Sequence, residues 1–592
     1  MSSRSRPWSI LTVTFLLAAG FVSGASPASI VSDEEIRQYL TALQHLPENE
    51  LPRAELEIDP GARSPWRISR DEAVEDAERF FQLLQHGWCG YEYFRAGVGK
   101  EADAVDPFAK AQQAVLARLK EKGRWSPGAL ADLIHSKLAF VSDCHLKLGK
   151  KTFCRRHEFW FDPHLEVQEE SGEYRFTLDD ASHLLLKVDG ASPAPHLFPS
   201  VNAAGEAIHL LGVLSPGEPE PLVVTVRRAG DEVRLRRPLA RSDFRRRVRF
   251  AEERIGGIPV VRIRAFADHY GRELEAIVDR AESYRGEPYV ILDIRGNGGG
   301  NTRWPRQWIY SFTGHSPSLK QALTELVSRT SMTGRANLFA LMLESYREQE
   351  RPPVQADFDR FQAEAARFDD PGAKPYWSHV AIPHIDPIPN ETTLIVIQDG
   401  RVASAGEGVV SFLMNQVENV VFVGENTMGA LTFGQLSAHR LPHSNLLAYL
   451  PIKLNVPLDM EIREARGFAP DYWVPAQQAL NHAVAAARAG TIPSQVPLPA
   501  GYFNVAFVPE RPLPSWYPGK RDLVLGAVFL VAGVVFGVVN RNRDCTNFLI
   551  AGAVALAIGA GYVFFTSSAG YLLGAVGLSY LFIGFAKRPK KG

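Results

Sequence analysis

Ile291-Leu-Asp-Ile-Arg-Gly-Asn-Gly-Gly-Gly300 is the stretch that decides the fold of this 592-residue chain. An apolar strand ends here in Asp, Arg and Asn side chains and then in three consecutive glycines. Glycine adopts a positive φ without steric cost and leaves peptide N–H groups uncovered, so such a loop is able to direct N–H donors at an oxygen that gains negative charge. The stretch therefore predicts a strand end shaped around a ligand or a reacting group.

Further along the chain, Ser404 stands among small residues in Arg401-Val-Ala-Ser-Ala-Gly-Glu407. An apolar strand is predicted just before it, at Thr393 to Ile397, and a helix-like run follows from Gly406 to Gln416. A serine at a strand-to-helix turn is well exposed for attack. Because an unassisted serine hydroxyl is a poor nucleophile at neutral pH, a second side chain must take its proton.

Strands and helices alternate around these two stretches. Strands are predicted at Ile258 to Phe266, Tyr289 to Ile294 and Val420 to Val423, with a helix through Arg272 to Arg285. Strands separated by helices indicate an α/β architecture. A helical insertion from His315 to about Ala366 forms either a lid over the site or a solvated helix pair, and the sequence does not decide between them.

Four separate blocks resemble the core of the C-terminal processing and tricorn-like serine peptidases. They are the Asp-x-Arg-x-Asn-Gly-Gly-Gly run, the Ser-Ala-Gly-Glu turn, Val423-Gly-Glu-Asn-Thr427 and Gly467-Phe-Ala-Pro-Asp471. The resemblance covers roughly Gly256 to Ala487, with a weaker extension back to about Arg70 that takes in His145. It implies a crotonase-like (ClpP-like) spiral α/β peptidase core with an N-terminal helical domain and an inserted PDZ-like module.

The resemblance also indicates which side chain activates the serine. In the C-terminal processing branch a lysine directly follows a Gly-Glu-x-Thr-x-Gly motif, but here Ala430 follows Gly429, and the next lysine, Lys453, is out of register. A Ser-Lys mechanism is therefore not expected. The tricorn-like branch uses a histidine base before the PDZ-type module and a glutamate just before the Gly-x-x-Pro-Asp block.

Both positions of the tricorn-like branch are matched in this chain, by His145 in Ser142-Asp-Cys-His-Leu146 and by Glu464. The resemblance thus implies a triad in which Ser404 is the nucleophile, His145 accepts its proton and Glu464 orients the imidazole. The relatives carry a serine just before the histidine, where this chain has Cys144.

The residues around the nucleophile have implied roles as well. By analogy with other serine hydrolases, the oxyanion donors are the N–H groups of Gly299 or Gly300 and of Ala405. Glu407 is expected to bond to the helix N-terminus, where carboxylates are favoured. Three polar side chains of the first stretch are expected to hold the glycine loop in shape: Asp293, Arg295 and Asn297.

Composition argues against several other classes of function. The formal net charge is −1, so there is no overall electrostatic case for nucleic acid. No CxxC pair or Cys/His quartet suggests zinc, and no metal or cofactor is expected. Of the four cysteines, Cys89, Cys144 and Cys154 belong to the part predicted to be exported, where an oxidising compartment would allow one bridge among them. Their spacing does not decide whether a bridge forms or which pair forms it.

The two ends of the chain predict export and a membrane anchor. Arg4 and Arg6, an apolar run from Trp8 to Val22 and the small residues after it have the layout of a signal peptide, with an uncleaved anchor as the rival interpretation. Near the C-terminus, three apolar runs are separated by a cationic and a neutral loop and followed by a Lys-rich tail. Both signals place the catalytic domain outside and give a multi-pass anchor in membrane lipid; the runs are Leu523 to Val539, Phe548 to Phe565 and Tyr571 to Ala586.

Between the histidine and the core, alternating apolar and polar residues predict a small β-module of the PDZ type. Peptide binding by it and a purely structural insertion both stay open. The predicted division is a signal peptide at 1–25, an N-terminal helical domain with His145 at 30–160, the PDZ-like module at 161–245, the peptidase core at 246–490, a Pro-rich linker at 491–520 and three transmembrane helices at 521–592.

These observations predict a membrane-anchored serine endopeptidase, on the periplasmic or extracellular side, that acts on extended polypeptides through an acyl-enzyme. The alternatives are a non-catalytic ligand- or peptide-binding protein on the same scaffold, and a protein whose membrane bundle is the functional part. Oligomeric state and cleavage preference are not readable from the sequence.

Overall fold

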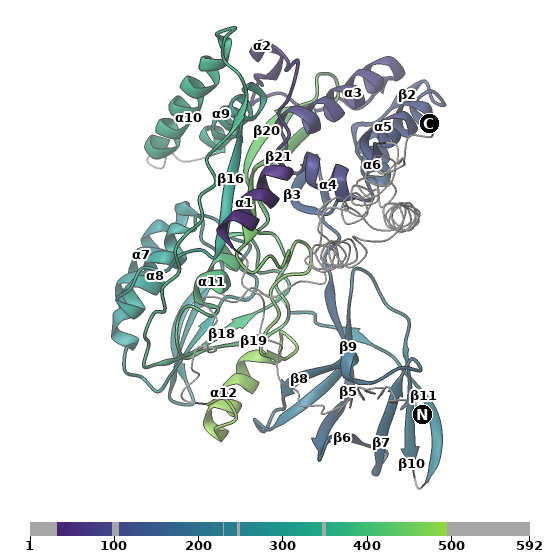
Figure 1. Cartoon of the computed structure of the whole chain (residues 1–592), viewed down its shortest axis with the longest axis vertical. Coiled ribbons are helices and arrows are strands. Elements are labelled where there is room, and N and C mark those ends of the chain that lie inside the picture. Colours follow the sequence, from purple (N-terminus) through teal and green to yellow (C-terminus); the bar gives the residue numbers. More distant parts are fainter. Residues whose placement is uncertain (1–31, 98–105, 229, 245–248, 346–350, 494–592) are drawn as a thin grey trace, which may run out of the picture.

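The computed structural model describes residues 32–97, 106–228, 230–244, 249–345 and 351–493. Figure 1 shows helices from the N-terminal part at one end of the molecule, a β-module at the other, and an α/β core beside them. The predicted signal peptide, nearly all of the Pro-rich linker and the three predicted transmembrane helices lie outside the described residues. Inside those ranges, no helix combines the length and apolar character needed to cross a membrane.

The N-terminal part is mainly helical, as its sequence pattern predicts. Ser69 begins the long third helix with a capping box: its hydroxyl accepts from the N–H of Glu72, and the Glu72 carboxylate accepts from the N–H of Ser69. The helices are α1 (Asp33–Ala42), α2 (Arg53–Leu56), α3 (Arg70–Gly87), α4 (Tyr91–Gly97), α5 (Pro107–Leu119) and α6 (Pro127–Lys137), and a short pair, β1 (Ile68–Ser69) and β2 (Arg124–Trp125), closes this part.

The core contains a six-stranded sheet with the order β13-β14-β15-β18-β19-β22. Its strands run parallel from β14 onward, and β13 adds an antiparallel edge. This confirms the α/β alternation read from the sequence. The strands are β13 (Phe250–Ile255), β14 (Ile258–Ile263), β15 (Tyr289–Asp293), β18 (Thr393–Gln398), β19 (Val420–Gly424) and β22 (Tyr472–Trp473).

Helices cover both faces of this sheet. Alternate strand residues point to opposite faces, so Leu292 packs with α7, α8 and α11, whereas its neighbour Ile291 packs with α12. Burial on both faces explains why strands such as β18 are apolar along nearly their whole length. The helices are α7 (Gly271–Arg280), α8 (Arg303–Thr313), α11 (Ala405–Leu413) and α12 (Ala479–Ala489).

A second, mainly antiparallel sheet joins the N-terminal part to the core. Its order is β17-β16-β21-β3-β4, and β20 also pairs with β21. The strand that carries His145 is therefore a member of a sheet shared with the core. The strands are β3 (Asp143–Leu148), β4 (Lys151–Phe153), β16 (Gln321–Val327), β17 (Tyr376–Trp377), β20 (Phe433–Arg440) and β21 (Leu447–Pro457).

The segment predicted as a helical insertion is only partly helical. It supplies β16 to the second sheet before forming α9 (Arg329–Ser345) and α10 (Arg351–Ala366). Met332 and Phe361 of this helix pair are buried against Ile452 of β21. The pair thus packs on the second sheet, where β16 is held by β21, and the expectation of a helix over the whole insertion is wrong at Gln321–Val327.

The inserted module is built from antiparallel strands in the order β11-β10-β7-β6-β5-β9-β8, with β12 on β5. Between Glu158 and Arg241 the described residues form one 3-10 turn, Ala194–His196, and no α-helix. Its likeness to a PDZ domain stays a prediction. The strands are β5 (Glu158–Glu170), β6 (Glu173–Leu178), β7 (Ala181–Val188), β8 (Leu197–Val201), β9 (Ala207–Ser215), β10 (Leu222–Arg228), β11 (Asp231–Arg237) and β12 (Ala240–Arg241).

Candidate active site

Ser404 lies at the turn between β18 and α11, where it is the N-cap of the helix. Its backbone has φ 53° and ψ −121°, a conformation that L-residues rarely adopt and that places the residue at a sharp, strained corner. The corner is fixed by hydrogen bonds: the Ala403 N–H donates to the Asn297 carbonyl at 3.0 Å, and the Gly406 N–H donates to the Ala403 carbonyl at 2.8 Å. Strain held in this way is typical of a serine presented for reaction.

The glycine loop lies directly against this serine. Gly299 has φ 98°, and a Cβ added to it would stand 2.8 Å from both the Ser404 Cβ and the Ala403 carbonyl oxygen. Gly300 has φ 138°, and an added Cβ would stand 2.2 Å from the backbone of Phe266. Both positions therefore exclude any side chain, which explains the run of glycines.

Two peptide N–H groups beside the serine are open. No hydrogen bond within the described part of the chain uses the N–H of Gly300 or of Ala405. The N–H of Gly299 instead donates to the Asn297 Oδ1 at 2.9 Å. Of the three predicted oxyanion donors, Gly300 and Ala405 thus have free hydrogen-bonding capacity, and Gly299 does not.

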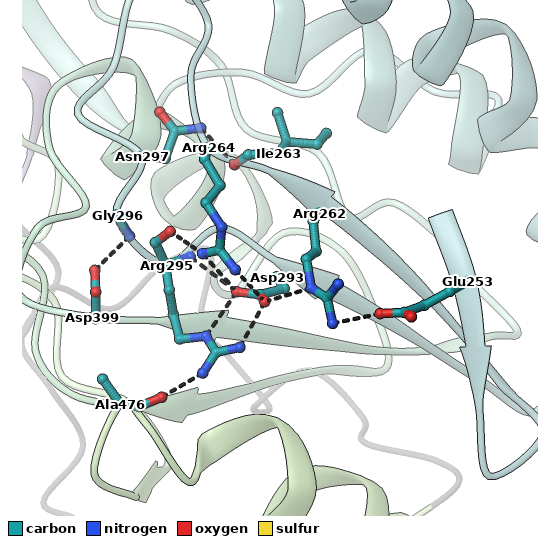
Figure 2. Close-up of polar contacts among 10 residues, drawn as sticks. All are labelled: Glu253, Arg262, Ile263, Arg264, Asp293, Arg295, Gly296, Asn297, Asp399 and Ala476. Atoms are coloured by element: carbon teal, nitrogen blue, oxygen red, sulfur yellow. Dashed lines mark hydrogen bonds and ion pairs between the residues drawn. The ribbon is translucent and has the colours of Figure 1, made fainter. Parts of the chain in front are cut away.

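A buried cluster of charges holds the strand end from which the glycine loop starts (Figure 2). Asp293 is fully buried and accepts hydrogen bonds from Arg295 at 2.7 and 2.8 Å and from Arg264 at 2.9 Å, with Arg262 at 3.4 Å. Burial opposes ionisation of Asp293, yet the bonds and charges of Arg295 and Arg264 keep its pKa below its usual range. Arg295 also donates to the Ala476 carbonyl.

The side chain of Asn297 completes this framework. Its Nδ2 donates to the Ile263 carbonyl at 2.9 Å, while its Oδ1 accepts from Gly299. Asp399 accepts from the Gly296 N–H at 2.8 Å, as Figure 2 shows. These bonds connect β14, the glycine loop and the turn after β18, so the loop and the serine corner form one rigid unit.

His145 lies on β3 and is half-buried. Its Nδ1 is buried without a hydrogen-bond partner among the described residues. Burial, followed by the positive charges of Lys147 and Lys453, lowers the pKa of His145 to about 4. The imidazole is therefore neutral near pH 7, which is the form that accepts a proton.

The Glu464 carboxylate contacts a backbone N–H of β3, the strand that carries His145. Its Oε1 accepts from the Cys144 N–H at 2.9 Å, and its Oε2 accepts from the Thr432 N–H at 3.1 Å. Burial, and next the charge of Asp143, raises the pKa of Glu464. Among the described residues, no hydrogen bond joins the His145 imidazole to Ser404 or to Glu464.

The structure nevertheless brings the three predicted triad segments together. Cys144, Ala403 and Ala465 belong to one buried apolar cluster, together with Ala430. Each of the first three is the direct chain neighbour of one triad residue. The backbones of the His145, Ser404 and Glu464 segments thus converge, although their side chains are not hydrogen-bonded to one another.

Sequence reasoning gave no role to Asp143, which the structure places beneath the histidine. Its Oδ1 accepts from the N–H groups of His145 at 2.7 Å and Leu146 at 3.0 Å, and its Oδ2 accepts from the Trp88 Nε1 at 2.8 Å. It is fully buried, and burial raises its pKa. An acidic residue inside the Ser142-Asp-Cys-His block was the available signal.

Glu407 has a larger role than the predicted bond to the helix N-terminus. This fully buried carboxylate accepts from the Thr427 hydroxyl at 2.5 Å, the Gly429 N–H at 2.7 Å and the Ala430 N–H at 2.6 Å. Burial raises its pKa to about 6, and a hydrogen bond from the Ser404 N–H is among the contacts that oppose this rise. Glu407 thus ties the serine helix to the loop that leads toward the Glu464 segment.

A disulfide joins Cys144 to Cys154, and Cys89 is a buried free thiol. The structure thus selects one pair among those that the spacing left open. Within the described ranges, no group of three or more His, Cys, Asp or Glu side chains is placed to hold a metal ion.

The fold and this site define a serine hydrolase with an α/β core, in which a strained serine corner faces a glycine loop. Residues 257–474 match peptidase family S41. This match covers the predicted core, confirms the resemblance to the C-terminal processing and tricorn-like peptidases, and supports a serine-type peptidase. No curated protein matches the sequence.

The chain is also similar to several solved structures, among them the following three. Mature CPAF in complex with lactacystin is 14% identical and has a TM-score of 0.39, with 72% of this chain and 99% of that chain covered. The photosystem II D1 C-terminal processing protease is 12% identical with a TM-score of 0.29, over 69% and 93% of the two chains. The tricorn protease is 12% identical with a TM-score of 0.29, over 70% of this chain and 35% of that one.

Proposed function

We propose that the protein is an exported, membrane-anchored endopeptidase that hydrolyses extended polypeptides with Ser404 as nucleophile, His145 as general base and Glu464 as the group that orients the base. One observation carries this proposal. Ser404 stands at a strained corner against Gly299, and the chain neighbours of all three residues share one buried cluster. This convergence supports a catalytic site to which three distant segments contribute a serine, a histidine and a carboxylate.

The reaction follows from the state of each group. The neutral imidazole takes the Ser404 proton while the hydroxyl oxygen attacks the peptide carbonyl, and the imidazolium then gives that proton to the leaving amine as the C–N bond breaks. Water hydrolyses the resulting ester by the same proton transfers in reverse. The open N–H groups of Gly300 and Ala405 stabilise the oxyanion, each by about 3 kcal/mol in comparable enzymes.

Substrate binding completes the hydrogen bonding in this proposal. The Nδ1 of His145 is buried without a hydrogen-bond partner in the described structure, and the partly buried Glu464 already accepts from the N–H of Cys144, the residue before the histidine. A turn of the imidazole lets Nδ1–H donate to Glu464 and directs Nε2 toward Ser404. Catalytic hydrogen bonds commonly form only in the substrate complex.

Replacing the nucleophile tests this function. We expect Ser404→Ala to abolish hydrolysis of an unfolded polypeptide and labelling by a fluorophosphonate, whereas Ser411→Ala, in the same helix, retains both. Labelling of the Ser404→Ala protein equal to that of the wild type would contradict the nucleophile assignment. Absence of labelling in the wild type would favour the non-catalytic alternative.

Export and anchoring are tested separately. The disulfide supports an oxidising compartment, because such bridges persist mainly outside the cytosol. We expect the full chain to sediment with membranes and to be digested by protease added outside the cytoplasmic membrane, and a chain that ends at residue 520 to be released. Recovery of the full chain in the soluble fraction would contradict the anchor.

A further inference from the structure

A groove of about 830 Å³ opens beside the candidate active site. Its lining includes Asn301 and Thr302, which directly follow Gly300, and Lys453 of β21. Residues of α8, the start of β16 and Phe412 of α11 also line it.

The position of the groove relates it to the catalytic residues. The Thr302 methyl group lies 3.7 Å from a Cβ placed on Gly408, one turn along the helix that Ser404 begins. Lys453, which also lines the groove, has a positive charge that contributes to the lowered pKa of His145. A polypeptide held at Ser404 with its carbonyl at the glycine loop therefore has this groove next to it.

The charged groups that line the groove are all cationic. Among its described lining residues are Arg303, Arg306 and Lys453, and none is Asp or Glu. Arg303 has a partner outside the groove, because Asp268 lies 3.4 Å away. Arg306 donates from its Nε to the Ser316 hydroxyl at 3.1 Å, which leaves its positive charge without a carboxylate in the described structure.

Lys453 is the more buried of the two remaining cations. Glu325 is its cross-strand partner in the β16–β21 pair, yet the Glu325 carboxylate accepts from the Gln435 amide at 2.6 Å, and no ion pair within 4 Å joins it to Lys453 among the described residues. A cation that is largely removed from water gains most from a carboxylate that arrives with a ligand.

A second, independent feature points to a peptide as the ligand. Gln321 is only 3% exposed and lines the groove, and its Oε1 has no hydrogen-bond partner in the described structure. A buried amide oxygen without a partner is costly, and the backbone N–H of an extended chain would satisfy it. Leu319, Leu323 and Phe412 provide apolar surface beside it.

We propose that this groove is a substrate subsite for acidic side chains, so that the peptidase prefers polypeptides with Asp or Glu close to the cleaved bond. Arg306 and Lys453 bind the carboxylates, and Gln321 accepts from the substrate backbone. The inference rests on the proposed function, because it assigns the substrate class of the same site.

Matched peptides test the preference. Internally quenched peptides with both ends blocked would carry either two Glu or two Gln on one side of the same cleavage site, and a third would carry two Gln with a free C-terminal carboxylate. We expect a kcat/KM about tenfold higher for the Glu peptide than for either Gln peptide. We also expect the ratio to fall as salt is added. Equal rates would overturn the proposal, and a preference only for the free C-terminus would overturn its assignment to side chains.

Variants locate the preference in the groove. We expect Arg306→Gln and Lys453→Gln to reduce the Glu/Gln ratio through KM, whereas Arg236→Gln, an exposed cation of the β-module, leaves it unchanged. Arg306 is on the surface, so Arg306→Glu should fold and should shift the preference toward a peptide with two Lys. An unchanged Glu preference in Arg306→Glu would overturn the role of Arg306.

Binding to an inactive protein separates this inference from the proposed chemistry. Fluorescence anisotropy with Ser404→Ala should show about tenfold tighter binding of the Glu peptide than of the Gln peptide. Equal binding would contradict the subsite even if the wild type proves to be a peptidase. Hydrolysis that persists in Ser404→Ala would contradict the proposed nucleophile, whatever the peptides show.

Discussion

The two halves of the candidate site are built in different ways. The serine half consists of the glycine loop and the Ser404 corner, which follow neighbouring parallel strands, β15 and β18, and are joined by backbone hydrogen bonds. The histidine half is assembled from β3, which carries the disulfide, and from the Glu464 segment, which lies 320 residues further along the chain. The first half is thus preformed by local geometry, whereas the second depends on long-range assembly.

The halves also differ in their polar groups. In the serine half, Asp293 is matched by two buried arginines, and its carboxylate is stabilised as an anion. In the histidine half, the buried Asp143 and the partly buried Glu464 have no ion pair among the described residues, and burial raises the pKa of both. A change of redox state should act on the histidine half, which carries the disulfide, and leave the serine half largely intact.

The largest effect is expected from loss of the base. His145→Ala should lower kcat/KM by about 10⁴-fold, because the Ser404 hydroxyl then has no group to take its proton. His384→Ala, at a position whose side chain is 86% exposed, provides the matched control and should retain full activity. A kcat/KM of His145→Ala within a factor of a few of the wild type would show that another group is the base. The strand β3 would then not be part of the catalytic centre.

A smaller loss is expected from a methyl group in the serine half. Gly299→Ala places a Cβ against Ser404 and strains a backbone with φ 98°, so we expect a loss of about 100-fold in kcat/KM. Gly298→Ala is the control, because a Cβ there meets nothing within 4 Å. Equal activity of the two variants would show that the loop is not as rigid as its contacts indicate.

The sequence predicted the serine half well, because its signals are local. Each of these signals lies within a short stretch of sequence. They are the alternation of strands and helices, the run of glycines, and a serine among small residues. The strands at Tyr289–Asp293 and Thr393–Gln398 and the helix after Ser404 all formed where the pattern placed them. The hydrogen bond from the Gly299 N–H to the Asn297 Oδ1 could not be predicted from the pattern, because it depends on the three-dimensional positions of both groups.

The histidine half was less predictable for a physical reason. His145 and Glu464 were found only through the resemblance to a family, since an isolated histidine or glutamate carries no periodic signal. Pairing of β3 with β21 joins residues such as Lys147 and Tyr449, and no local pattern encodes such a contact. Asp143 and the Cys144–Cys154 pair are closer in sequence, but a single acidic residue and a cysteine spacing do not specify a partner.

The disulfide offers a way to perturb the histidine half alone. Cys154→Ser, or reduction of the wild type, removes the bond beside Cys144, whose N–H donates to Glu464, so we expect kcat/KM to fall about tenfold through imprecise placement of His145. Fluorophosphonate labelling should slow in parallel, while the serine half remains folded. Cys89→Ala, which removes the buried free thiol and keeps the disulfide, is the control and should retain the kcat/KM of the wild type.

The smallest effect concerns the acid limb of activity, which depends on the His145 imidazole. The base works only when neutral, so kcat/KM should rise with pH through the pKa of His145, which lies near 4, and not through the ordinary value of 6.5. Activity at pH 5.5 should therefore stay within about a factor of two of that at pH 7.5, whereas an ordinary histidine would lose about tenfold. Lys147→Gln removes a positive charge that helps to lower this pKa, so its acid limb should move to higher pH, and Lys110→Gln, on α5 in the N-terminal part, should leave the limb in place. An acid limb near 6.5 in the wild type would contradict the lowered pKa of His145. It would mean that water reaches the imidazole more freely than its burial indicates.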